Sequence, residues 1–179
     1  IKIHDEAMDE LTEKDLVQSG EVGEILIDSP TVTPGYFEMP EKTKLAKITV
    51  DGRIFHRMGD VGYLDAEQNL WFCGRKDHLV QTQAHRYFSI PTEAIFNTHP
   101  KVKRCALVKV NRSAALVIER IDHQTHKDLK LISELKELSL GVESSQDIKD
   151  FYFHSDFPVD VRHNIKIDRK KLWIYAQNE

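Results

Sequence analysis

Short apolar stretches rich in β-branched residues alternate with turn sequences through the first 74 residues. This pattern predicts β-strands rather than helices. Asp51-Gly52 lies between two such stretches, which is a strong signal for a hairpin. Strands this short and this closely spaced predict a small barrel or a strongly bent sheet. The predicted strands are 24–27, 48–50, 53–55, 61–65 and 70–73.

After Gly74 the pattern changes to longer apolar runs and helical spacing. In residues 126–140, Leu131, Leu135 and Leu138 recur on one helical face, with Leu129 and Ile132 beside them. This half therefore predicts an α+β unit of about 100 residues, an ordinary domain size. We expect helices at 91–99, 126–140 and 168–176, and strands at 105–110, 114–118 and 150–154.

Charge and composition exclude several classes of protein. The 179 residues carry 25 basic and 29 acidic side chains, a net charge of −4, so a nucleic-acid partner is not expected. No apolar run approaches the roughly 20 residues of a membrane-spanning helix. Two cysteines, Cys73 and Cys105, are too few for a disulfide framework, which favours a cytoplasmic location. Both cysteines lie in apolar strands, where we expect buried structural thiols.

The chain begins Ile1-Lys2-Ile3, without an initiator methionine or a signal peptide. We expect a fragment whose upstream partner is a further domain of the same protein. The sequence contains no Walker-type phosphate loop, GxGxxG, HExxH or CxxC motif. His123 and His126 are the one closely spaced histidine pair, and we interpret them as a solvated turn rather than a metal site.

Three segments could carry chemistry, although each is ordinary by itself. Residues 58–65 (MGDVGYLD) resemble a turn, 74–78 (GRKDH) a charged linker, and 157–172 a solvated face containing Lys166. Together, in this order, they resemble the C-terminal part of the adenylate-forming superfamily. That family includes acyl-CoA synthetases, peptide-synthetase adenylation domains and luciferases. The matching stretches are 20–25 (GEVGEI), 34–37 (PGYF), 56–60 (HRMGD), 74–77 (GRKD), 91–95 (PTEAI) and 164–172 (NIKIDRKKL).

The resemblance implies an α+β fold in which residues 1–76 are the β-rich, barrel-like end of the large AMP-binding domain. Residues 77–179 would form a small mobile α+β C-terminal lid domain, with Asp77 as the hinge. The family joins a carboxylate to ATP, giving an acyl-adenylate and pyrophosphate. ATP and Mg²⁺ are therefore the implied cofactors, and the Mg²⁺ ligand would lie upstream of this chain.

The resemblance also assigns roles to three side chains. Asp60 would accept hydrogen bonds from the ribose hydroxyls, which suits a charged, acceptor-only group. Arg75 would contact the ribose and phosphate side through its planar donor fork. Lys166 would stabilise charge that develops on the carboxylate and α-phosphate oxygens.

The sequence departs from the family pattern at two places. The family's glycine before the lysine is Ile165 here, and residues 82–86 (TQAHR) replace a glycine-rich turn that shapes the thiol channel in relatives. This leaves the use of CoA open. Residues 71–76, 96–100 and 158–164 resemble the β-lactone synthetases of bacterial olefin biosynthesis, which need no external thiol.

We therefore expect the C-terminal fragment of an enzyme that activates a fatty or β-hydroxy fatty acid and forms a β-lactone, releasing AMP and pyrophosphate. A fatty acyl-CoA ligase or a peptide-synthetase adenylation domain is the alternative. A second alternative is a non-catalytic interaction module that docks a partner through residues 151–153 or the helix at 129–140. We expect the isolated chain to be inactive, because most of the binding surfaces would lie upstream.

Overall fold

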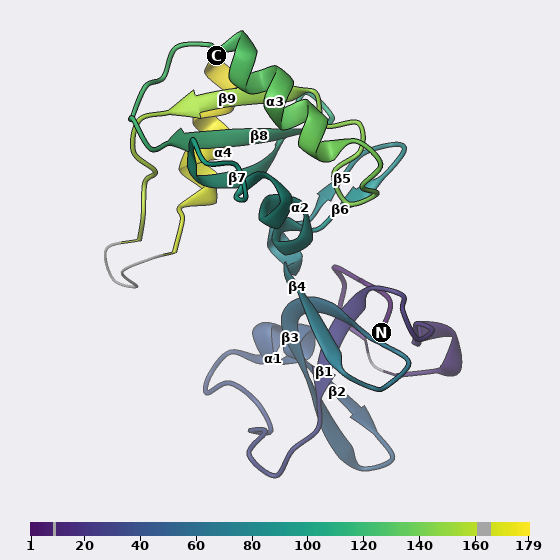
Figure 1. The fold of residues 1–179 in the computed structure, drawn as a ribbon. Helices are drawn as coiled ribbons and strands as arrows, with labels where there is room; N and C mark the ends of the chain where they lie inside the picture. The colour runs from purple at the N-terminus through teal and green to yellow at the C-terminus, as the bar shows by residue number, and fades with distance from the viewer. Residues whose placement is uncertain (9, 161–165) are drawn as a thin grey trace. The chain divides into compact units, whose positions relative to one another are not determined.

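The computed structural model describes residues 1–8, 10–160 and 166–179, which form two compact units, Ile1–Asp77 and His78–Glu179 (Figure 1). Both units contain helices and strands, so the predicted α+β class is confirmed. The sequence placed the boundary between residues 76 and 77. The units divide between residues 77 and 78.

A four-stranded antiparallel sheet around strand β3 organises the first unit. Strand β1 pairs along one edge of β3, and β2 and β4 both pair along its other edge. We expected a small barrel or a strongly bent sheet. Among the described residues the sheet is open and does not close into a barrel. The elements are η1 (Glu13–Asp15), β1 (Gly23–Ile27), α1 (Pro40–Ala46), β2 (Lys47–Val50), β3 (Arg53–Leu64) and β4 (Leu70–Arg75).

Both predicted hairpins of the first unit are present. In the β2–β3 turn, Asp51 and Gly52 have φ angles of 48° and 76°. Two consecutive positive φ angles are characteristic of the tight turn that matches strand twist. The β3–β4 turn is closed by Asp65, whose carboxylate accepts hydrogen bonds from the Asn69 amide (2.8 Å) and from Trp71 Nε1 (2.7 Å). The Trp71 hydrogen bond is the main cause of the lowered pKa of Asp65.

A three-stranded sheet in the order β7-β8-β9 forms the centre of the second unit. Its two faces are covered by different helices (Figure 1). Helices α2 and α3 pack on the face that carries Cys105, Leu107 and Leu116, whereas α4 packs on the face that carries Ala106 and Val117. The elements are η2 (Lys76–His78), which spans the division between the units, β5 (Val80–Gln81), β6 (Arg86–Tyr87), α2 (Ser89–Phe96), β7 (Val102–Val110), β8 (Ser113–Arg120), α3 (Leu129–Ser139), β9 (Asp150–His154) and α4 (Arg169–Asn178).

Several details differ from the expectation. Helix α2 begins at Ser89, two residues before the expected start, with Pro91 in its first turn. Helix α3 begins after Asp128, whose side chain accepts the Leu131 amide, and Leu129 is exposed rather than part of the core. The expected burial of both cysteines is confirmed, and burial raises the pKa of each thiol. No described helix is long and apolar enough to cross a membrane.

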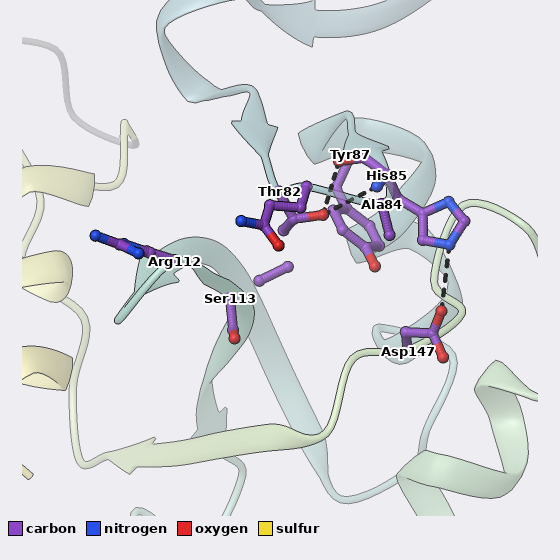
Figure 2. Close-up of a pocket in the computed structure, with 9 residues that line it drawn as sticks. Thr82, Ala84, His85, Tyr87, Arg112, Ser113 and Asp147 are labelled. Carbon is purple, nitrogen blue, oxygen red and sulfur yellow. Dashed lines mark hydrogen bonds and ion pairs between the residues drawn. The ribbon is translucent and has the colours of Figure 1, made fainter.

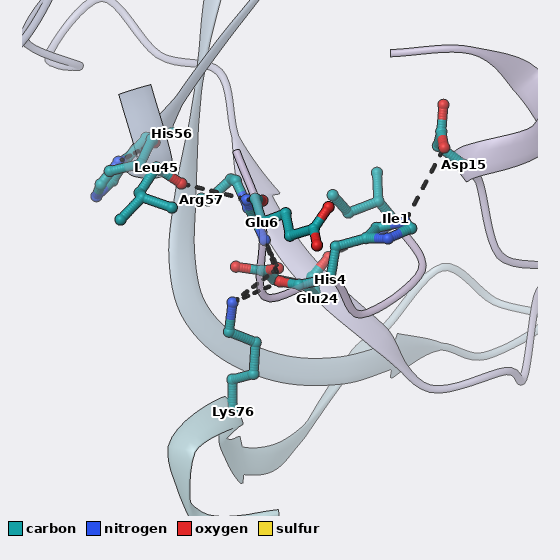
Figure 3. Close-up of polar contacts among 10 residues, drawn as sticks. Ile1, His4, Glu6, Asp15, Glu24, Leu45, His56, Arg57 and Lys76 are labelled. Atoms are coloured by element: carbon teal, nitrogen blue, oxygen red, sulfur yellow. Dashed lines mark hydrogen bonds and ion pairs between the residues drawn. The ribbon is translucent and has the colours of Figure 1, made fainter. Parts of the chain in front are cut away.

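A buried ion pair ties the first unit together (Figure 3). Arg57 and Glu24 are 5% and 3% exposed, and the Arg57 guanidinium donates to Glu24 Oε2 at 2.7 Å. The same guanidinium donates to the carbonyl oxygens of His4 (2.5 Å), Glu6 (2.6 Å) and Leu45 (3.2 Å). One side chain therefore connects the N-terminal segment, β1, β3 and α1.

This geometry predicts a large destabilisation on replacing Arg57→Met. The substitution leaves a buried carboxylate whose remaining cation, Lys76 Nζ, is 3.5 Å away. Breaking a buried pair from one side costs about 3–5 kcal/mol in the free energy of unfolding. Urea titration followed by Trp71 fluorescence, in a Trp173→Phe background, reports on the first unit alone.

Arg53→Met is the matched control. Arg53 forms an ion pair with Asp28, but its side chain is largely exposed. Losing such a pair costs at most about 1 kcal/mol. Equal destabilisation by the two substitutions would contradict a special role for the buried pair.

Candidate functional site

Asp60 and Arg75 lie directly opposite each other on β3 and β4. Arg75 Nη1 donates to Asp60 Oδ1 at 2.8 Å and to the Met58 carbonyl oxygen at 3.3 Å. The Arg75 side chain is 53% exposed and that of Asp60 is 20% exposed. The fold therefore brings together two residues that are 15 positions apart in the sequence and presents both to solvent.

Both residues stand beside interruptions in regular strand pairing. Between the pairs Glu24↔Val61 and Leu26↔Arg57, β1 advances by two residues and β3 by four, so residues 58–60 bulge out of the β1 pairing. Gly59 within this bulge has φ 65°, which glycine adopts at least cost. A second irregularity in the β3–β4 pairing follows Val61. Bulges of this kind redirect side chains.

The paired groups remain available for a ligand. Among the described residues, no donor contacts Asp60 Oδ2. An ion pair as exposed as this one contributes little to stability, because water screens it and the arginine loses entropy in holding it. A polyhydroxyl group could thus bind to the carboxylate, while the remaining guanidinium donors bind an anionic oxygen.

Asp77, the expected hinge residue, lies in η2 and is exposed. The residue before it is fixed, because Lys76 Nζ donates to the His4 carbonyl oxygen at 2.8 Å. The division between the two compact units falls immediately after Asp77. Asp77 therefore lies between Lys76, which is held by a hydrogen bond, and His78, the first residue of the second unit.

Lys166 belongs to the second unit, and its side chain is exposed. Its carbonyl oxygen accepts the Asp160 amide (3.0 Å), and two residues later the Asp168 amide donates to the Pro158 carbonyl oxygen (2.8 Å). Asp168 then caps α4 by accepting the Lys171 amide. The expectation attached to Ile165 lies outside the described residues.

Two buried carboxylates near this segment were not identified as site residues from the sequence. Glu93, in the 91–95 stretch, accepts two hydrogen bonds from Arg169, at 2.5 and 2.8 Å. Glu119, inside the apolar strand β8, accepts from Arg104 Nε (2.5 Å) and from the Phe157 amide (3.1 Å). An acidic residue that directly follows the apolar run 114–118, inside a strand, is the signal that could have identified Glu119.

The Glu119 carboxylate is charged at neutral pH. Burial raises its pKa, but the hydrogen bonds from Lys103, from Arg104 and from the Phe157 amide together lower it by more. The pKa of Glu119 therefore lies below the ordinary value. Its contribution to stability is therefore present at neutral pH and is lost as the pH falls through that lowered pKa.

The segment 82–86, where relatives were expected to have glycines, forms the turn between β5 and β6 and the first residue of β6 (Figure 2). Thr82 closes the turn by donating its amide to the His85 carbonyl oxygen (2.9 Å) and accepting the His85 amide at its hydroxyl (3.0 Å). His85 Nε2 also lies 3.2 Å from Asp147 Oδ2. A pocket of about 370 Å³ adjoins this turn and extends to residues 112–114. The described residues contain no group of three or more side chains that could hold a metal ion.

The chain is similar in sequence to curated enzymes, although no protein-family model matches it. It is 41% identical to an olefin beta-lactone synthetase of Xanthomonas campestris pv. campestris over 100% of the chain, and 39% identical to that of Stenotrophomonas maltophilia. A D-alanine–D-alanyl carrier protein ligase of Bacillus mycoides is 29% identical over 88% of the chain. The chain spans 34% of the length of the two synthetases and 32% of the ligase.

Solved structures give the same assignment at the level of the fold. ATP-bound MatB from Rhodopseudomonas palustris superposes with a TM-score of 0.73 at 24% identity, covering 96% of this chain and 33% of that one. O-succinylbenzoate coenzyme A synthetase from Bacillus subtilis, in complex with AMP, has a TM-score of 0.72 at 19% identity, covering 92% and 32%. The chain is thus similar, over its whole length, to the C-terminal part of adenylate-forming enzymes.

Proposed function

We propose that this chain is the C-terminal part of an ATP-dependent ligase that activates a β-hydroxy fatty acid and converts it to a β-lactone. The observation that carries the proposal is the solvent-accessible Asp60–Arg75 pair, held at 2.8 Å beside a bulge in a chain 41% identical to an olefin beta-lactone synthetase. The upstream two-thirds of the enzyme would supply the remaining surfaces for ATP, Mg²⁺ and the acid. A cytoplasmic location remains a prediction.

The first step would form the acyl-adenylate. A carboxylate oxygen of the acid attacks the α-phosphorus of ATP, and pyrophosphate leaves. Asp60 would bind the ribose hydroxyls through its carboxylate, and Arg75 would contact the ribose and phosphate oxygens. The Lys166 ammonium would stabilise the negative charge that develops on the reacting oxygens. Asp77 would act as the hinge through which the second unit brings this lysine to the nucleotide.

In the second step the hydroxyl oxygen of the substrate would attack its own activated carbonyl carbon. The hydroxyl proton is released, the bond to phosphate breaks, and AMP leaves with the phosphate oxygen, so that acid plus ATP gives lactone, AMP and pyrophosphate. The turn at 82–86 supports this intramolecular route. Thr82 and His85 close it without glycine, and Asp147 holds it from the neighbouring segment.

Product analysis distinguishes this proposal from the alternatives. We expect the full-length enzyme, given ATP, Mg²⁺ and a long-chain β-hydroxy acid without CoA, to release AMP and a product lighter than the acid by one water. Lys166→Ala should lower the rate by about 10²–10³-fold, because one preorganised donor to developing charge is lost. Mass spectrometry of the lipid product, with AMP quantified in parallel, measures both.

Lys170→Ala is the matched control, since Lys170 is also an exposed lysine of the same segment, and it should retain full activity. A thioester formed only with CoA would establish the acyl-CoA ligase alternative instead. ATP-independent binding of a protein partner, with no turnover of any acid, would favour an interaction module.

A second experiment tests the nucleotide role of Asp60. In Asp60→Asn the ribose hydroxyls lose a charged acceptor, and such hydrogen bonds contribute about 1.5–3 kcal/mol. We expect the KM for ATP to rise about 10-fold to 100-fold, with a smaller change in kcat. Steady-state kinetics in varied ATP measure both quantities.

Asp28→Asn provides the comparison, because Asp28 is another partly exposed carboxylate paired with an arginine in the same unit. Its KM for ATP should equal that of the unmodified enzyme. An unchanged KM in Asp60→Asn would remove the ribose-binding assignment.

A further inference from the structure

The segment that carries Lys166 is fastened to the second unit's sheet at its beginning. Phe157 donates its amide to Glu119 Oε2 at 3.1 Å, and its ring lies under the Arg104 guanidinium at 5.1 Å. Glu119 is fully buried and holds two cations, Lys103 at 2.6 Å and Arg104 at 2.5 Å. The start of the segment is therefore attached to β7 and β8 through one buried carboxylate.

The end of the segment is fastened by a second buried carboxylate on a different element. Glu93 on α2 forms a two-pronged ion pair with Arg169, three residues after Lys166, at 2.5 and 2.8 Å. Glu93 Oε1 also accepts the Leu107 amide at 2.8 Å. This ties α2, β7 and the first turn of α4 together at one point.

Between these two attachments, hydrogen bonds hold the segment's ends to each other. Val159 and Ile167 form an antiparallel bridge, flanked by the Asp160–Lys166 and Asp168–Pro158 backbone hydrogen bonds. The backbone of Lys166 and the residues after it is thus paired with residues 158–160, whereas the Lys166 side chain is exposed.

We propose that Glu93 and Glu119 are positioning residues that fix the Lys166 backbone relative to the sheet, so that the second unit delivers the lysine as part of one rigid body. This inference rests on the proposed function in taking Lys166 as the lysine that stabilises the reacting oxygens. A displacement of about 1 Å in such a group can lower a rate by as much as about 10²-fold. The anchors therefore affect kcat through Lys166, while ATP affinity depends on Asp60 and Arg75 in the first unit.

The decisive test is a double-mutant cycle in the full-length enzyme, measured as ATP–pyrophosphate exchange. Glu93→Gln weakens the pair with Arg169 and should lower kcat by about 10-fold or more, with the KM for ATP within twofold of normal. In a Lys166→Ala background the same substitution should change kcat by less than about twofold, because the group it positions is already absent. A structural defect would instead add to the loss caused by Lys166→Ala.

Glu134→Gln is the matched control. Glu134 on α3 is also paired, with Lys101 at 3.0 Å and His99 at 3.3 Å, and it forms no ion pair with a described residue of the Lys166 segment. Its kcat should be unchanged. If circular dichroism shows that Glu93→Gln does not fold, Arg169→Lys decides the matter, since it keeps the charge but loses the two-pronged geometry. Its kcat should fall several-fold, again only when Lys166 is present.

A structural readout in the 179-residue chain separates this inference from the proposed function. Amide hydrogen exchange at Asp160 and Asp168, measured by NMR, should be at least about 10-fold faster in Glu119→Gln or Arg169→Lys, while the capped Leu131 amide on α3 stays unchanged. Unchanged exchange together with normal kcat in the anchor variants would overturn the inference. Full activity in Lys166→Ala would instead overturn the role proposed for the lysine.

Discussion

The buried Arg57–Glu24 pair is the constraint on which the first unit depends (Figure 3). A guanidinium removed from water is tolerated only when nearly all its donors find acceptors, and Arg57 meets this requirement with one carboxylate and three carbonyl oxygens. Asp60 follows Arg57 by three residues, and Arg75 immediately precedes Lys76, which contacts the same carboxylate. The exposed pair is therefore attached at both of its strands to a cluster that has one favourable arrangement.

Strand pairing in the first unit is irregular beside the candidate residues Asp60 and Arg75. Residues 58–60 bulge away from β1, and Gly59 adopts a left-handed φ that would strain other residues. Such irregularities lower the stability of the sheet, so they persist only where surrounding contacts determine them. Arg57 on one side of the bulge and Val61 on the other are both buried, and they provide those contacts.

Local signals in the sequence predicted the elements well, because hairpins and helices depend on neighbouring residues. The Asp51-Gly52 turn, the strand at 150–154 and the amphipathic helix α3 are examples. The short α1 and the two-residue strands β5 and β6 were missed, since none has enough apolar periodicity to stand out from a loop. The resemblance identified Asp60, Arg75 and Lys166 as candidate residues, but not the ion pair between the first two.

Two ion pairs between residues far apart in the sequence could not be predicted from local patterns, and both have the same arrangement. In each unit a buried carboxylate pairs with a cation that lies three residues from a candidate residue: Glu24 with Arg57 near the partly exposed Asp60, and Glu93 with Arg169 near the exposed Lys166. An exposed side chain on a short segment has few contacts of its own, so its position must come from a neighbour that is held strongly. Charge-assisted hydrogen bonds in a dry environment suit this task, because they fix direction as well as distance. The stretches 56–60 and 164–172 thus each combine a candidate side chain that solvent reaches with a nearby arginine held in a buried ion pair.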